Sequence, residues 1–196
     1  MNDIGFSQII VTKLLNLKTI DYFRDQALRY YPENIHESDG KYLKTEQYLK
    51  LKQKIEKCNS NKSNLNSFII SLENNLPNKL IYENKMGSNY PCHEIQISIQ
   101  ETNELVRVIA IYISFLIPYY YICELNGLKE NKKIIHKTYK NIDGEEKIIR
   151  EKLNSFFKYK NFPDELIFSN IKNIIVLEKF NMFNAFFNDA FRIFNF

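Results

Sequence analysis

Cys92 and His93 stand side by side and are the residues of this sequence with the most potential for nucleophilic catalysis. A thiol activated by an imidazole is a common arrangement in enzymes that form covalent intermediates. The polar–apolar alternation of residues 94–100 predicts a strand, however, and adjacent residues in a strand point to opposite faces. No glycine directly flanks the pair, and a free cysteine is more often a small apolar residue. We therefore expect that Cys92 and His93 do not act together.

The other residues that could hold a metal ion or a phosphate group follow no productive spacing. The three histidines share neither a helical nor a strand repeat: His36, His93 and His136. Phosphate cradles need clustered glycines, and the five glycines stand apart. The acid pairs at 145–146 and 164–165 lie at expected helix starts, where carboxylates complement the helix dipole. We predict a non-enzymatic protein without metal or cofactor, and an enzyme with a dispersed site is the less favoured alternative.

Tyrosine is the residue type that most suggests binding, because the chain holds 13 of them and several stand in tandem. Tyrosine is enriched at protein interfaces, since its ring buries area while its hydroxyl group stays polar. The candidate partner-binding residues come from two tandem runs: Tyr30, Tyr31, Tyr119 and Tyr121. The structural alternative is that these rings pack between the sheet and its helices.

A lysine-rich segment offers a second binding hypothesis. Its cations are Lys41, Lys44, Lys50, Lys52, Lys54, Lys57 and Lys62. Only Glu46 and Glu56 oppose them, so the alternative function is a nucleic-acid-associated or mobile-element-encoded protein. The segment has no arginine, the residue suited to bidentate phosphate contacts, and the net charge of +4 is modest. A solvated helix face is the simpler explanation, so the sequence favours a protein partner over nucleic acid.

Hydrophobic periodicity predicts the elements that must position these residues. Helices are expected over residues 6–17, 19–31, 42–58, 65–76, 145–158 and 181–191. Strands are expected over residues 80–83, 94–100, 105–117, 119–125, 134–139 and 173–177. Asn126-Gly127 is a typical turn pair, and Pro118 belongs at a bend. This order predicts an α+β fold: N-terminal helices, a central, mainly antiparallel sheet of about five or six strands, and C-terminal helices packed on it.

No repeat or flexible linker divides the 196 residues, so we predict a single domain. Its parts are mainly helical (1–78), antiparallel sheet (79–140) and helix–strand–helix (141–196). Residues 108–123 are uncharged, but this run is too short for a membrane-spanning helix and its composition favours strands, so no membrane insertion is expected. Three widely spaced cysteines and an N-terminus without a basic segment predict a cytoplasmic protein.

The tail over residues 181–189, Asn-Met-Phe-Asn-Ala-Phe-Phe-Asn-Asp, follows a hydrophobic segment. It resembles the ending of some small bacterial immunity proteins, which occur beside polymorphic or contact-delivered toxins. The resemblance implies a cytoplasmic, non-enzymatic protein that binds and neutralises a cognate toxin domain. Inhibitors of basic nucleases usually present an acidic face, whereas this chain is net positive. A nuclease toxin is therefore the less favoured target, unless charge is locally segregated.

Overall fold

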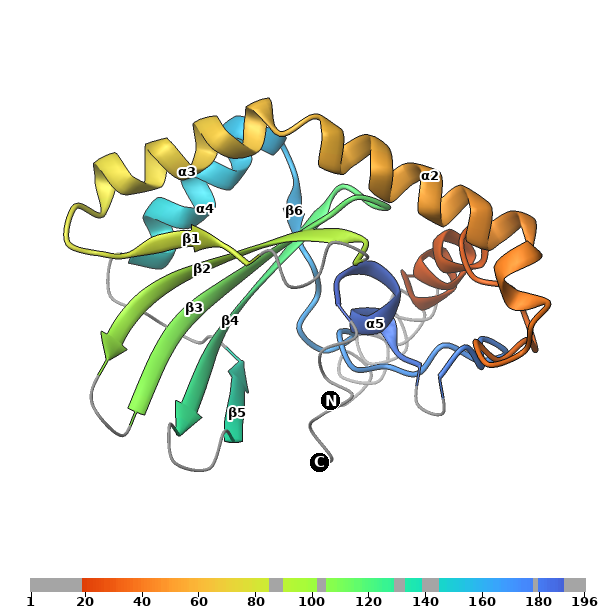
Figure 1. Cartoon of the computed structure of the whole chain (residues 1–196). Coiled ribbons are helices and arrows are strands. Elements are labelled where there is room, and N and C mark those ends of the chain that lie inside the picture. The colour runs from red at the N-terminus through yellow and green to blue at the C-terminus, as the bar shows by residue number, and fades with distance from the viewer. Residues whose placement is uncertain are drawn as a thin grey trace, which may run out of the picture.

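The computed structural model describes residues 19–84, 90–101, 105–128, 133–138, 145–177 and 180–188, and within them it has the predicted α+β fold (Figure 1). Residues 19–28 form a helix. The helices that follow are η1 (Tyr42–Lys44), α2 (Glu46–Ser60), α3 (Ser63–Asn75), α4 (Glu145–Phe157) and α5 (Met182–Phe186). The strands are β1 (Ile81–Glu83), β2 (Cys92–Glu101), β3 (Leu105–Ser114), β4 (Tyr119–Leu128), β5 (Lys133–Thr138) and β6 (Lys160–Asn161).

The sheet is an antiparallel meander in the order β1-β2-β3-β4-β5. Its strand pairs follow the chain, as the short predicted turns require, and the register between β3 and β4 is continuous from Leu105↔Leu128 to Ile113↔Tyr120. The short strand β6 adds a parallel pairing to the start of β4. The prediction of a mainly antiparallel sheet of about five or six strands is therefore confirmed.

One face of the sheet is lined with isoleucine and is covered by α3 and α4 (Figure 1). It is formed by alternate residues of β2, β3 and β4: Ile95, Ile97, Ile109, Ile111, Ile113, Tyr120 and Ile122. Phe68 and Leu72 of α3 and Ile149 and Leu153 of α4 are buried against it. Burial of each such side chain contributes roughly 1.5–3 kcal/mol, so this layer is a major source of stability.

The opposite face of the sheet is aromatic. Tyr112 and Tyr121 pack there against Phe183 of α5, with ring centroids 5.1 and 5.9 Å away. The helix over residues 19–28 and α2 complete this second layer of the core, α2 through Leu51 and Ile55. The Tyr31 hydroxyl group donates a hydrogen bond to the Ala185 carbonyl oxygen (3.0 Å), which ties the end of the first helix to α5.

Several local predictions are wrong, for reasons that the backbone explains. Asn126-Gly127 lies inside β4, opposite Ile135 and Ile134, because continued pairing with β5 outweighs the turn preference. Residues 173–177 form no strand: Asn173 is left-handed (φ 68°), and the Asn173 and Val176 carbonyl oxygens accept hydrogen bonds from the loop N–H groups of Asn34 and Glu37 (2.8 and 3.2 Å). The helix expected from residue 42 begins at Glu46, because Thr45 caps it by accepting a hydrogen bond from the Tyr48 N–H.

Other differences concern the ends of the chain. The helix expected over residues 6–17 lies outside the described residues. The helix expected over 181–191 is shorter than predicted, because α5 ends at Phe186 and residues 187–188 are not helical; residues 189–191 lie outside the described part of the chain. The strand β6 was not predicted, because two residues carry no periodicity.

No helix in the described part of the chain is long and apolar enough to cross a membrane. The uncharged run 108–123 lies in β3, a bend and β4, which confirms its assignment to strands.

Candidate functional site

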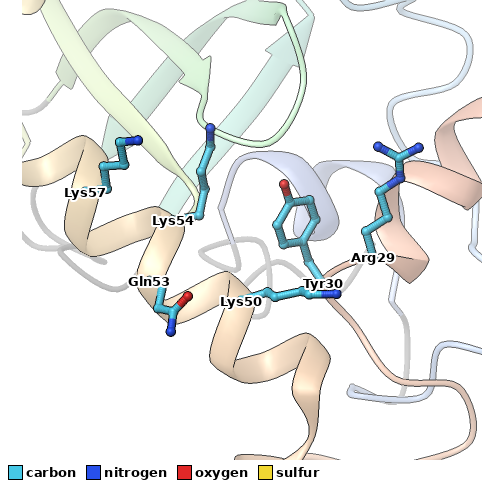
Figure 2. Close-up of a pocket in the computed structure, with 6 residues that line it drawn as sticks. All are labelled: Arg29, Tyr30, Lys50, Gln53, Lys54 and Lys57. Atoms are coloured by element: carbon cyan, nitrogen blue, oxygen red, sulfur yellow. The ribbon is translucent and has the colours of Figure 1, made fainter.

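A pocket of about 530 Å³ opens between α2 and the end of the first helix (Figure 2). The described residues that line it are Arg29, Tyr30, Lys50, Gln53, Lys54 and Lys57, and we call it the cationic pocket. Four of these side chains carry a positive charge, one is an amide and one a phenol. Such a lining donates hydrogen bonds and attracts anions.

The spacing of apolar and polar residues on α2 places three lysines at the pocket. Leu51 and Ile55 are buried in the aromatic layer of the core, which fixes the rotation of the helix. Lys50, Lys54 and Lys57 follow one another at intervals of four and three residues, so they form one stripe along the helix. Core packing thereby turns this stripe toward the pocket.

The other wall is the turn that ends the first helix. Phe23 and Ala27 are fully buried and hold this helix against the core. The Tyr30 and Tyr31 N–H groups both donate hydrogen bonds to the Ala27 carbonyl oxygen (2.9 and 3.0 Å), which closes the helix before Pro32. Because Tyr31 points inward, its neighbour Tyr30 reaches the pocket, where it is partly buried.

The pocket contains more positive charge than its ion pairs balance. The Nζ atom of Lys50 lies 2.6 Å from Oε1 of Glu46 on the preceding turn. Within the part of the chain that the structure describes, Lys54, Lys57 and Arg29 form no ion pair. Burial raises the pKa of the Cys58 thiol, and the charges of Lys54 and Lys57 oppose that rise. Three cations of the pocket are therefore available to a ligand.

The structure places the seven lysines of the basic segment in different surroundings. Lys50, Lys54 and Lys57 line the pocket, whereas Lys41, Lys44 and Lys52 do not. The Nζ atom of Lys52 lies 4.0 Å from Glu56, and that of Lys62 lies 2.6 Å from Glu83. Arg29 was missed by the sequence analysis, because a single arginine beside two tyrosines has no local pattern that distinguishes it.

The structure also separates the four candidate tyrosines. Tyr30 lines the cationic pocket, and Tyr119 is partly buried against Phe23 and Phe162. Tyr31 and Tyr121 lie in the core, with exposed fractions of 5% and 0%. Tyr31 and Tyr121 therefore pack in the core, as the structural alternative proposed. Of the four candidates, only Tyr30 and Tyr119 are accessible to a partner in this structure.

The residues with potential for nucleophilic chemistry lie apart, as expected. Cys92 is buried in the aromatic layer, where burial, and then the charge of Glu94, raise the pKa of its thiol well above the ordinary value. His93 lies on the other face, with Nδ1 3.6 Å from Oε1 of Glu83. Burial lowers the pKa of His93 to about 4, and the Glu83 carboxylate only partly offsets that effect. Among the described residues, no group of three potential ligands is placed to hold a metal ion.

The different burial of the three cysteines predicts the order in which their thiols react with an alkylating reagent. Cys92 and Cys123 are buried and their thiol pKa values are raised well above normal by burial, whereas Cys58 is partly exposed. We expect iodoacetamide to label Cys58 first in the folded protein, and all three thiols only after denaturation. Mass spectrometry of the labelled peptides measures this, with Cys58→Ser as the control. Native labelling of Cys92 or Cys123 at the rate of Cys58 would contradict the packing described here.

Comparisons with protein-family models, with curated proteins and with solved structures find no match to this chain.

Proposed function

We propose that this chain is a non-enzymatic binding protein that engages a protein partner at the cationic pocket. The observation that carries the proposal is the placement of Arg29, Lys54 and Lys57, from two separate elements, around one concavity beside Tyr30. Arginine and tyrosine are over-represented among the residues that dominate binding energy. The backbones that carry these groups are fixed by packing against the core, so binding does not have to order them.

The charges around the pocket favour a protein over a nucleic acid. Asp25 stands one turn before Arg29 on the same helix and is exposed, and Glu46 lies beside Lys50. These carboxylates weaken the attraction of this part of the surface for a long phosphodiester chain, because like charges repel. An acidic patch on a protein surface, by contrast, can be limited to the area that faces the cations of the pocket.

More specifically, we propose that the partner is a bacterial toxin. This chain would neutralise the toxin by binding to it and occluding it. The support for this more specific proposal is the resemblance of residues 181–189 to the tail of immunity proteins, together with a pocket suited to an acidic surface. In the structure most of that tail is α5 and its cap, where the Asn184 N–H donates to Oδ1 of Asn181 (3.0 Å) and the Asn181 N–H donates to Oδ1 of Asn184 (3.1 Å). The tail therefore supports the wall of the pocket through Tyr31.

The direct test is binding to the product of the neighbouring gene. We expect a complex with submicromolar affinity by isothermal titration calorimetry, and rescue of cells from the toxicity of that product when this chain is co-expressed. No binding at micromolar concentrations together with no rescue would refute the proposal.

Association with nucleic acid is a second candidate, because Lys50, Lys54 and Lys57 do lie together with Arg29. It makes a distinct prediction: affinity for single-stranded DNA or RNA would fall steeply with salt, with a log–log slope of about −0.7 for each phosphate neutralised. Fluorescence anisotropy at a series of salt concentrations measures this slope. A flat response, or no binding at low salt, would remove this candidate.

A further inference from the structure

We propose that the ligand of the cationic pocket is an acidic α-helix of the partner, lying along α2 with carboxylates one turn apart. This inference rests on the proposed function, since it names the chemistry by which a protein partner would be recognised. Lys50, Lys54 and Lys57 form the contact stripe, and Arg29 and Tyr30 close the site from the opposite wall (Figure 2).

The spacing of the lysines favours a helical ligand. Along a helix that rises 1.5 Å per residue, Lys50 and Lys54 stand about 6 Å apart and Lys54 and Lys57 about 4.5 Å apart. A second helix that runs parallel to α2 with acids at i, i+4 and i+7 repeats these two intervals in the same order. An extended peptide repeats about 6.7 Å between side chains on one face, so it matches only the first interval.

The opposite wall suits carboxylates as well. The guanidinium group of Arg29 presents a planar set of donors that can bind both oxygens of one carboxylate. The Tyr30 hydroxyl and the Gln53 amide add neutral donors beside the charged groups. The pocket volume of about 530 Å³ accommodates several side chains from one face of a helix, and a nucleic-acid duplex is far too wide to enter it.

The imbalance of charge indicates how many acids the ligand should carry. Lys50 lies 2.6 Å from Glu46 in an exposed ion pair, which a carboxylate of the ligand can replace, and Lys54, Lys57 and Arg29 have no ion pair among the described residues. Two or three carboxylates complement these cations. A ligand with many more negative charges would also meet Glu46, which lies beside Lys50.

The experiment uses the intact chain and a fluorescent, alanine-rich peptide of about 18 residues, long enough to be partly helical. Three glutamates stand at i, i+4 and i+7, and a second peptide of the same composition distributes them around the helix. We expect the first peptide to bind at least about fivefold more tightly at low ionic strength, where surface charges are least screened. Equal binding of the two peptides, or tighter binding of an oligothymidine with the same net charge, would overturn the inference.

Matched substitutions on α2 test whether the peptide binds at the cationic pocket. Lys54→Gln should weaken peptide binding about threefold and Lys54→Gln/Lys57→Gln about tenfold, whereas Lys52→Gln, the same change on another face of the helix, should have no effect. If the double variant bound the peptide as well as the wild type, the inference would be wrong.

Binding of the neighbouring gene product to the same variants separates the two proposals. If that protein binds the wild type and the double variant equally, the helix inference fails while the proposed function stands. If it does not bind and the register-dependent peptide does, the pocket chemistry is supported and the proposed partner is wrong.

Discussion

Replacing Phe162 with alanine is expected to lower the free energy of unfolding by about 3–5 kcal/mol, the range for removing a large aromatic ring from a packed core. Phe162 is fully buried at the end of β6, and its N–H donates a hydrogen bond to the Tyr120 carbonyl oxygen (2.8 Å). Natural domains are stable by only about 5–15 kcal/mol, so this loss would be a large share of the total.

The size of the effect follows from the position of the ring between three elements. Its centroid lies 4.4 Å from that of Phe23 in the first helix and 5.9 Å from that of Tyr119 in β4. It also lies 5.7 Å from the centroid of Phe187, just after α5. A cavity at this point removes contacts from all three elements at once, and it can close only if these packed elements move toward one another. The same loss should loosen the wall that carries Arg29 and Tyr30.

Urea unfolding followed by far-ultraviolet circular dichroism measures the change. Phe168→Ala is the matched control: Phe168 is 42% exposed and its ring contacts that of Phe183, so its loss should cost clearly less than that of Phe162. Phe162→Leu, which refills most of the space, should cost about 1 kcal/mol and remains measurable if the alanine variant does not fold. Equal unfolding midpoints for Phe162→Leu, Phe168→Ala and the wild type would show that the site is not a tightly packed junction.

The second large effect is a loss of stability in mild acid. The pKa of His93 is lowered from 6.5 to about 4, first by burial and then by the nearby charge of Lys62, while the Glu83 carboxylate raises it in part. The unfolded chain therefore binds a proton between these two pH values that the folded chain excludes. By linkage, stability is highest above pH 6.5 and falls as the pH drops towards 4.

The difference between the two pKa values corresponds to about 3 kcal/mol, since each unit is worth about 1.4 kcal/mol. His93 is only 8% exposed, and its ring lies 4.6 Å from that of Phe115, so a protonated imidazole would lose much of its hydration. The charged groups that face it are Glu83 on β1, 3.6 Å away, and Lys62, whose Nζ lies 2.6 Å from the same carboxylate oxygen. Lys62 already occupies that oxygen, which limits how far Glu83 can favour a charged histidine.

A His93→Gln variant isolates this contribution from the other groups that titrate in acid. We expect its unfolding free energy to change less between pH 6.5 and 4 than that of the wild type, with the two curves converging at low pH. Urea unfolding at several pH values gives both curves. In parallel, the His93 ring proton should titrate near pH 4 by NMR. Parallel pH curves for the two proteins would contradict the burial of a neutral His93.

The amino-acid sequence was sufficient to predict the layered fold, because the polar–apolar patterns that predict helices and strands involve residues only a few positions apart. The alternation in β2 predicted one face with Ile95 and Ile97 and another with Glu94 and Gln96, and the first two are buried against the helices. The pairing of the strands in chain order followed from short connections. The turn predicted at Asn126-Gly127 and the strand predicted over residues 173–177 were wrong, because pairing or backbone conformation outweighed local preference.

The candidate site could be predicted only in part. The lysine stripe and Tyr30 were identified as separate hypotheses from composition and tandem spacing, and neither pattern suggested that they belong together. Arg29 was not identified at all. Conversely, Tyr31 and Tyr121 were reasonable interface candidates from residue type alone, since only their burial in the core assigns them to packing.

The sequence by itself therefore determined the main helices and the strands of the meander and which face of each is apolar, because residues a few positions apart decide both. The tertiary structure alone decided which faces meet. The hydrogen bond from Tyr31 to Ala185 joins residues 154 positions apart, and the cationic pocket joins α2 to a turn about twenty residues before it. Such contacts depend on the free energy of packing the whole chain, and no local pattern encodes that quantity.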